Sequence, residues 1–96
     1  MKTKRDRLDI IRELLENVSR GYSSKSSLLK SMGISASSLN SYLAYAMEKN
    51  LIKESERGFE LTEKGREVLS MLNEYATLEG KLLLIMEALY RELEEL

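Results

Sequence analysis

The 96-residue chain contains no cysteine, no histidine, no proline and no tryptophan. Without cysteine it can form neither a disulfide nor a thiolate metal site. Without histidine it also lacks the commonest metal ligand and general base. Aspartate occurs only at Asp6 and Asp9, both in the first predicted helix. We therefore expect no enzyme activity, no catalytic or metal site and no cofactor.

Long apolar runs are missing too. No stretch approaches the roughly 18 consecutive apolar residues of a membrane span. The basic residues at the N-terminus are not followed by the apolar core of a signal peptide. We expect one small soluble domain without a membrane partner, located in the cytoplasm and associated with the nucleoid.

The net charge of −1 conceals an uneven distribution of charge along the chain. Residues 1–66 contain 13 Lys and Arg against 9 Asp and Glu, whereas residues 67–96 contain 2 against 7. A basic front and an acidic rear are typical of a DNA-binding domain followed by a separate assembly element. A solvated helical tail would produce the same division, so the pattern does not decide alone.

Apolar residues at helical spacing predict a first helix over residues 4–19 and a second over residues 25–32. Gly33 then turns the chain, and Ser35 caps a third helix that runs to about residue 49. The expected inward-facing residues are Leu8, Ile11, Leu15 and Val18 in the first helix, and Leu39, Leu43 and Met47 with Ala46 in the third.

Two short strands are predicted at residues 51–54 and 58–61, with Gly58 in the turn between them. Thr62 caps a fourth helix, and no proline stops it before residue 96. This order predicts a mainly α fold with a small β-hairpin, a winged helix-turn-helix. We expect the winged helix-turn-helix domain at residues 1–66 and a long dimerisation helix, continuous with it, at residues 62–96.

The third helix has a polar face suited to DNA. Hydroxyl groups can reach phosphates and base edges, and a tyrosine ring can lie along a sugar or a thymine methyl. The face lacks Arg, Gln and Lys, so we expect weak sequence discrimination. The alternative is an ordinary three-helix core with solvated serines. The predicted DNA-binding residues of the helix-turn-helix are Lys25, Ser35, Ser37, Ser38, Ser41, Tyr42 and Tyr45.

Two groups of cations flank this predicted surface. A basic arm can follow a neighbouring groove, and a wing can contact the backbone. Glutamates beside the wing cations would repel phosphate, and basic termini are often only solvated. The predicted contacts are Lys53 and Arg57 in the wing, Lys64 at the start of the fourth helix, and Lys4, Arg5 and Arg7 in the N-terminal arm.

The fourth helix predicts an assembly interface. Apolar residues recur in it at alternating steps of three and four, as in a coiled coil. One helix cannot cover so many apolar side chains, so we expect a partner, most simply a second copy of the chain. The alternative is a break at Gly80 that folds the segment back onto the first helix. The predicted interface residues are Leu72, Tyr75, Glu79, Leu82, Leu83, Met86, Leu89, Tyr90, Leu93 and Leu96.

Three segments resemble the archaeal winged-helix family of small chromatin-associated and regulatory DNA-binding proteins. They are LNSYL at residues 39–43, KNLI at residues 49–52 and LTEKG at residues 61–65. The resemblance covers roughly residues 5–96. It implies a homodimer joined by an antiparallel coiled coil, with a domain that binds duplex DNA at each end. The chain departs from the family in having Asn50 instead of glycine, an acidic overall balance and a serine-rich third helix.

The sequence thus predicts a homodimeric protein that binds double-stranded DNA, either a transcriptional regulator or a small nucleoid-associated protein. The alternative is a winged-helix protein-interaction module without direct DNA binding. Heptads alone do not distinguish parallel from antiparallel pairing, and no small-molecule ligand is evident.

Overall fold

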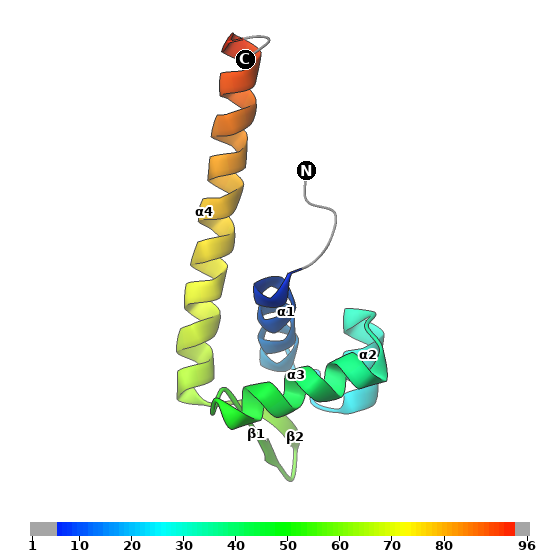
Figure 1. Ribbon diagram of the computed structural model, residues 1–96. Helices are drawn as coiled ribbons and strands as arrows, with labels where there is room; N and C mark the ends of the chain where they lie inside the picture. The colour runs from blue at the N-terminus through cyan, green and yellow to red at the C-terminus, as the bar shows by residue number, and fades with distance from the viewer. Residues whose placement is uncertain (1–5, 94–96) are drawn as a thin grey trace.

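A computed structural model describes residues 6–93 of the chain (Figure 1). Its elements are α1 (Arg7–Ser19), α2 (Lys25–Met32), α3 (Ala36–Glu48), β1 (Ile52–Ser55), β2 (Gly58–Leu61) and α4 (Glu63–Leu93). The first three helices and the hairpin pack together, and α4 extends from them as a rod. The predicted fold class, mainly α with a β-hairpin wing and a long C-terminal helix, is confirmed.

Helix α1 begins three residues later than the sequence predicted, because Asp6 is its N-cap. The carboxylate of Asp6 accepts the backbone N–H of Asp9 at 2.9 Å, and the Asp9 side chain accepts the N–H of Asp6 at 3.3 Å. This capping box satisfies two donors that the first turn of a helix leaves unpaired. Residues 4 and 5 of the predicted helix lie outside the described residues.

The helix-turn-helix consists of α2, a tight turn and α3, at the predicted positions. Ser24 caps α2 with its side chain. Gly33 ends that helix in the left-handed conformation at φ 66°, which glycine adopts without steric cost. Ser35 then caps α3 by accepting the backbone N–H of Ser38 at 3.1 Å.

Strands β1 and β2 form an antiparallel hairpin, with Ile52 opposite Leu61 and Ser55 opposite Gly58. Gly58 has φ +105° and is the first residue of β2, which spans the predicted residues, whereas β1 begins one residue later than predicted. A Cβ at this position would collide with the backbone carbonyl of Ser23. The same carbonyl accepts the N–H of Phe59 at 2.9 Å, so the wing is fastened to the connection between α1 and α2.

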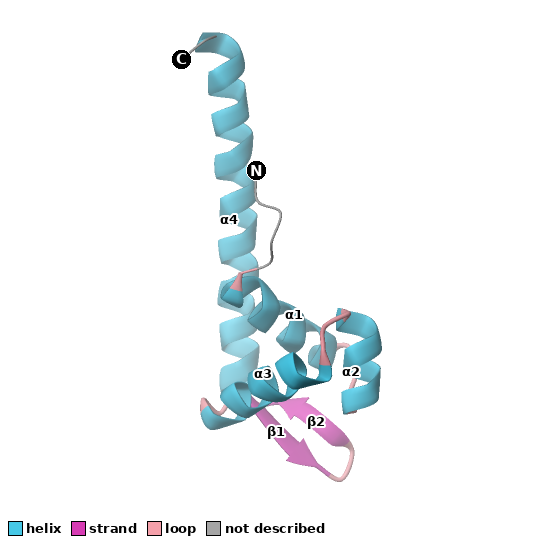
Figure 2. Cartoon of the chain, turned by 45° about the vertical axis from the view of Figure 1, so that its right-hand side comes forward, coloured by secondary structure: helices cyan, strands magenta, loops and turns pink. Residues whose placement is uncertain are grey.

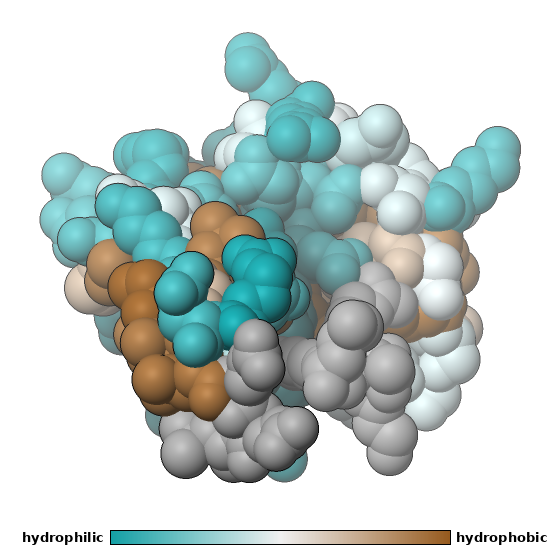
Figure 3. Space-filling view, turned by 90° about the horizontal axis from the view of Figure 1, so that it is seen from above, coloured by the Kyte–Doolittle hydropathy of each residue, from teal (hydrophilic) through white to brown (hydrophobic). Residues whose placement is uncertain are grey.

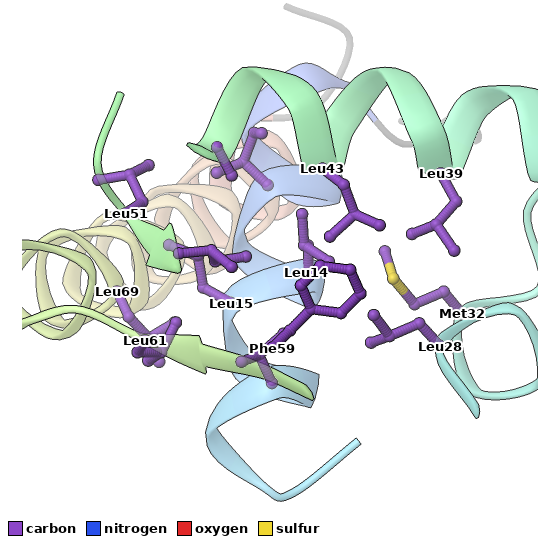
Figure 4. Close-up of a cluster of buried hydrophobic side chains, with 14 of the residues drawn as sticks. Leu14, Leu15, Leu28, Met32, Leu39, Leu43, Leu51, Phe59, Leu61 and Leu69 are labelled. Carbon is purple, nitrogen blue, oxygen red and sulfur yellow. The ribbon is translucent and has the colours of Figure 1, made fainter. Parts of the chain in front are cut away.

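The hydrophobic core lies where α1 meets the other elements (Figure 4). Leu14 and Leu15 project from α1 toward side chains of α2, α3 and the hairpin, and both are fully buried. Leu8, which the sequence predicted to face inward, is 45% exposed. It stands in the first turn of α1, where no other element covers its side of the helix fully.

Helix α3 is anchored by Leu39, Leu43 and Ala46, whereas Met47 is 37% exposed. The prediction of Met47 in the core stripe was wrong because two consecutive steps of four residues rotate it about 80° from Leu39. Ala46, seven residues from Leu39, returns to within about 20° of it. The buried face of α3 therefore contains the residue seven positions after Leu39 and not the residue eight positions after it.

Helix α4 continues without interruption through Gly80, so the alternative of a break and fold-back is wrong. Its 31 residues span about 46 Å at about 1.5 Å per residue. Its first turns pack on the domain: a Cβ at Gly65 would collide with the carbonyl of Leu51, and Leu69 and Leu72 are buried in the core. Among the described residues, none of the helices combines the length and apolarity that crossing a membrane requires.

Candidate nucleic-acid interface

Helix α3 exposes one face because the core holds the opposite face. Leu39, Leu43 and Ala46 are each at most 2% exposed, against α1 and the hairpin. The hairpin lies beside α3 at the foot of α4 (Figure 2). A helix held in this way on a small domain can present its free face to a groove of DNA.

The predicted polar residues of α3 divide into two groups. Ser37, Ser41 and Tyr45 are exposed. Ser38 and Tyr42 are half-buried, and the Tyr42 ring packs against the edge of the core. The exposed group can reach a ligand directly, whereas Tyr42 also supports the helix.

The charge on α3 is negative. Its only charged residue is Glu48, which is exposed in the last turn. Just beyond the helix, the ammonium of Lys49 lies 5.7 Å from the centre of the Tyr45 ring, within the range of a cation–π contact. Lys49 was not predicted as a site residue, although the four-residue spacing from Tyr45 was a signal that could have revealed it.

A hollow of about 480 Å³ separates the start of α1 from the free face of α3. It joins Arg7, from the predicted basic arm, to the polar face of α3. Lys4 and Arg5 of that arm lie outside the described residues. The hollow is lined by Arg7, Leu8, Ile11, Ser37, Ser38, Ser41, Tyr42 and Tyr45.

The wing cations are exposed, and neither of them lines the hollow beside α3. Arg57, in the turn of the hairpin, lines a second hollow of about 420 Å³ together with Arg66 of α4 and the end of α1. None of the residues lining it comes from α3. Lys53 is exposed on β1. The structure thus does not bring Arg57 and the polar face of α3 into one pocket, although both belong to the same domain.

Three other predicted residues sit at helix ends. Lys25 is the exposed first residue of α2. The hydroxyl of Ser35 is engaged in capping α3 and also donates to the hydroxyl of Ser38 at 3.0 Å. Lys64 Nζ donates to the carbonyl of Lys49 at 3.0 Å, so this cation stabilises the end of α3. Ser35 and Lys64 therefore have structural roles of their own.

Helix α4 exposes large apolar side chains from Met71 onward. Seen from above, apolar surface gathers on one flank of the helix (Figure 3). Each of these large side chains is between 45% and 68% exposed. These residues are Met71, Tyr75, Leu78, Leu82, Leu83, Leu84, Ile85, Met86, Leu89, Tyr90 and Leu93.

Leu72 and Glu79, two residues of the predicted assembly interface, are not among these exposed apolar side chains. Leu72 is 9% exposed and belongs to the core of its own domain, because α1 covers that side of α4. Glu79 is half-buried. Leu96 lies outside the described residues.

Comparison with known proteins agrees with the order of helices and strands described above. A family model described as winged helix-turn-helix matches residues 4–80, which include the three short helices, the wing and the first half of α4. No curated protein matches the chain. The family match suggests DNA binding.

Proposed function

We propose that this chain, which belongs to the winged helix-turn-helix family, is a homodimeric protein that binds double-stranded DNA. Helix α3 enters the major groove, while the wing and the basic N-terminal residues contact the backbone. The observation that carries the proposal is the anchoring of α3 by one face, which leaves Ser37, Ser41 and Tyr45 free on the other. In this role the protein acts on the nucleoid in the cytoplasm, as a transcriptional regulator or a small architectural protein.

The chemistry of α3 predicts that backbone contacts supply most of the affinity. The helix contains no Lys, Arg or Gln and only one Asn, Asn40, so it has few side chains for bidentate base contacts. Serine hydroxyls bond to either base edges or phosphates and discriminate weakly. Specific and random duplexes should therefore bind with similar affinity, and the affinity should fall steeply with salt.

The test is a salt titration of binding to specific and random duplexes, made on the full chain and on two variants. Ser37→Glu with Ser41→Glu places two negative charges on the exposed face of α3 and should abolish binding. Ser70→Glu with Thr77→Glu adds the same charge to exposed positions of α4 and should leave most of the affinity. Affinity independent of salt, or full binding by the α3 variant, would show that α3 is not the reading helix.

We also propose that α4 pairs with α4 of a second copy. At roughly 90 Å² exposed for each large side chain, the ten side chains other than Leu84 give about 900 Å² per copy. A stable interface needs about 800 Å² per partner. Ten of the eleven, all except Leu84, lie within a sector of about 160° around the helix axis. A second copy with the same sector is the simplest surface that covers it.

The proposed pairing is antiparallel. In a parallel pair, Glu79 of one copy would face Glu79 of the other, and the acidic segments at residues 67–96 would lie together. In an antiparallel pair, the acidic C-terminal end of each α4 lies at the start of the partner's α4, beside the partner's basic domain, and the helix dipoles oppose each other. Charge therefore favours the antiparallel arrangement.

A second candidate function is a protein-interaction module that does not contact DNA. The observation that favours it is the absence of Lys and Arg from α3, together with the exposed Glu48. The same titration separates the two functions. No binding to duplex DNA even at low salt would support the interaction module and contradict DNA binding.

A further inference from the structure

The hollow between α1 and α3 contains groups that the fold does not require. Leu8 remains 45% exposed on one wall, although it belongs to the apolar stripe of α1. The hydroxyls of Ser37 and Ser41 have no hydrogen-bond partner among residues 6–93, and Arg7 makes no ion pair with any residue of that range. The volume of about 480 Å³ is within the range of about 300–1,000 Å³ typical of small-molecule sites.

The lining has one apolar part and one polar part. Leu8, Ile11 and the rings of Tyr42 and Tyr45 supply the apolar part. Two phenol rings beside aliphatic side chains suit a planar aromatic ligand, since offset and edge-to-face ring contacts are favourable.

The polar part suits an anion. Arg7 brings a guanidinium that can bind a carboxylate with two hydrogen bonds. Ser37 and Ser38 stand in the first turn of α3, where the helix dipole favours negative charge. Asp6 and Asp9, the carboxylates nearest to Arg7 in the sequence, form the capping box of α1.

We propose that this hollow binds a small aromatic carboxylate. Its carboxylate lies between Arg7 and the hydroxyls of Ser37 and Ser41, and its ring lies on Leu8 and Ile11 against the two tyrosines. The bound anion would share Ser37, Ser41 and Tyr45 with the proposed DNA surface and would compete with DNA. Only this competition rests on the proposed function; binding of the carboxylate does not.

The test of binding is a titration of the ¹⁵N-labelled full chain with 2-naphthoate in the absence of DNA, followed by amide chemical shifts. We expect saturable shifts at Ser37, Ser38 and Ser41, with a dissociation constant in the millimolar range or below. Neutral 2-naphthamide tests the need for charge, and cyclohexanecarboxylate tests the need for an aromatic ring. Both should bind at least several-fold more weakly.

The variants test the role assigned to Arg7. Arg7→Gln removes the cation from an exposed position and should weaken 2-naphthoate binding about tenfold. Lys30→Gln removes an exposed cation of α2 that does not line the hollow, and it should leave binding unchanged. Absence of saturable shifts at the three serines, equal binding of the amide, or unchanged affinity of Arg7→Gln would overturn the proposal.

A competition experiment addresses the consequence for DNA. If the chain binds a duplex, 2-naphthoate at saturating concentration should release it, and the same concentration of 2-naphthamide should not. Saturable binding of 2-naphthoate to a chain that fails to bind any duplex would support the carboxylate site and contradict the proposed DNA function. Duplex binding by a chain that shows no saturable binding of 2-naphthoate would support the DNA function and overturn the carboxylate site.

Discussion

The assembly proposal can be tested by removing two leucines from the centre of the exposed flank of α4. Leu82 is 62% exposed and Leu89 is 52% exposed, and they lie within about 20° of each other around the helix axis. In the proposed dimer both are covered by the partner helix. The double variant Leu82→Ala, Leu89→Ala should therefore dissociate the dimer while leaving the core of each domain intact.

The size of the effect follows from the burial of these side chains. Leu→Ala in a protein core costs about 2–5 kcal/mol, and we take about 1.5–2 kcal/mol here because an interface of two helices buries each leucine less completely. Each dimer contains four of the altered positions. The total of about 6–8 kcal/mol corresponds to a dissociation constant raised roughly 10⁴- to 10⁶-fold.

The chain contains its own control for this experiment. Leu84 is 68% exposed, as open as Leu82, but two residues along the helix place it about 200° away. Leu84→Ala removes the same atoms from the opposite side and should leave the dimer unchanged. This comparison separates loss of a contact from any change in helix propensity, because the substitution is Leu→Ala in both variants.

The measurement is sedimentation equilibrium over a range of concentrations. A dimer has a mass of about 22 kDa, twice the 11.0 kDa of the chain. The wild type and Leu84→Ala should sediment as dimers at micromolar concentration, and the double variant as a monomer. A dimeric double variant, or equal dissociation by Leu84→Ala, would refute the placement of the interface.

Three further predictions address stability and assembly. Gly65→Ala should destabilise the domain by about 1–3 kcal/mol, because the new Cβ meets the carbonyl of Leu51. Gly80→Ala should stabilise α4 by about 1 kcal/mol, because the new Cβ meets no other part of the domain within 4 Å. Chemical denaturation followed by circular dichroism measures both, and equal effects would contradict the close packing at Gly65. Leu14→Ala, at a fully buried position, should lower the free energy of unfolding by about 2–5 kcal/mol in the same assay, and a smaller loss would show that the core can collapse around it. Truncation after Thr77 should yield monomers with weaker DNA binding, since two linked sites no longer act together. A truncated chain that remains dimeric in sedimentation would show that the outer half of α4 is not the interface.

The sequence was most informative where local chemistry decides the structure. Serine caps, Gly33 and the hairpin glycine mark element ends through contacts a few residues away, and α2 and α3 begin where those signals stand. The start of α1 was misplaced because the basic residues before it look compatible with a helix. The reciprocal bonds of Asp6 and Asp9 instead make Arg7 the first residue of the helix.

The sequence was less informative about which neighbour covers an apolar residue. Leu72 fits the seam of a coiled coil as well as Leu82 does, yet α1 of the same chain covers Leu72 and no described residue covers Leu82. Periodicity shows that a residue lies on an apolar face of a helix. It does not show which element covers that face, and different elements can cover different parts of it along one helix. The hollow between α1 and α3 was not predictable for the same reason, since the sequence pattern makes Leu8 a core residue until the position of α3 is known.

The two halves of the chain depend on each other in the proposed mechanism. Helix α3 has no cation; Arg7 shares a hollow with it, whereas Arg57 lines a hollow that contains no residue of α3. One domain can therefore neutralise only a few phosphates, and its affinity should be low at physiological salt. A rigid α4 that joins two such domains makes the second contact intramolecular, which raises the overall affinity without any new contact to DNA. The uninterrupted helix through Gly80 is then a functional requirement, because a flexible joint there would lower the effective concentration of the second domain.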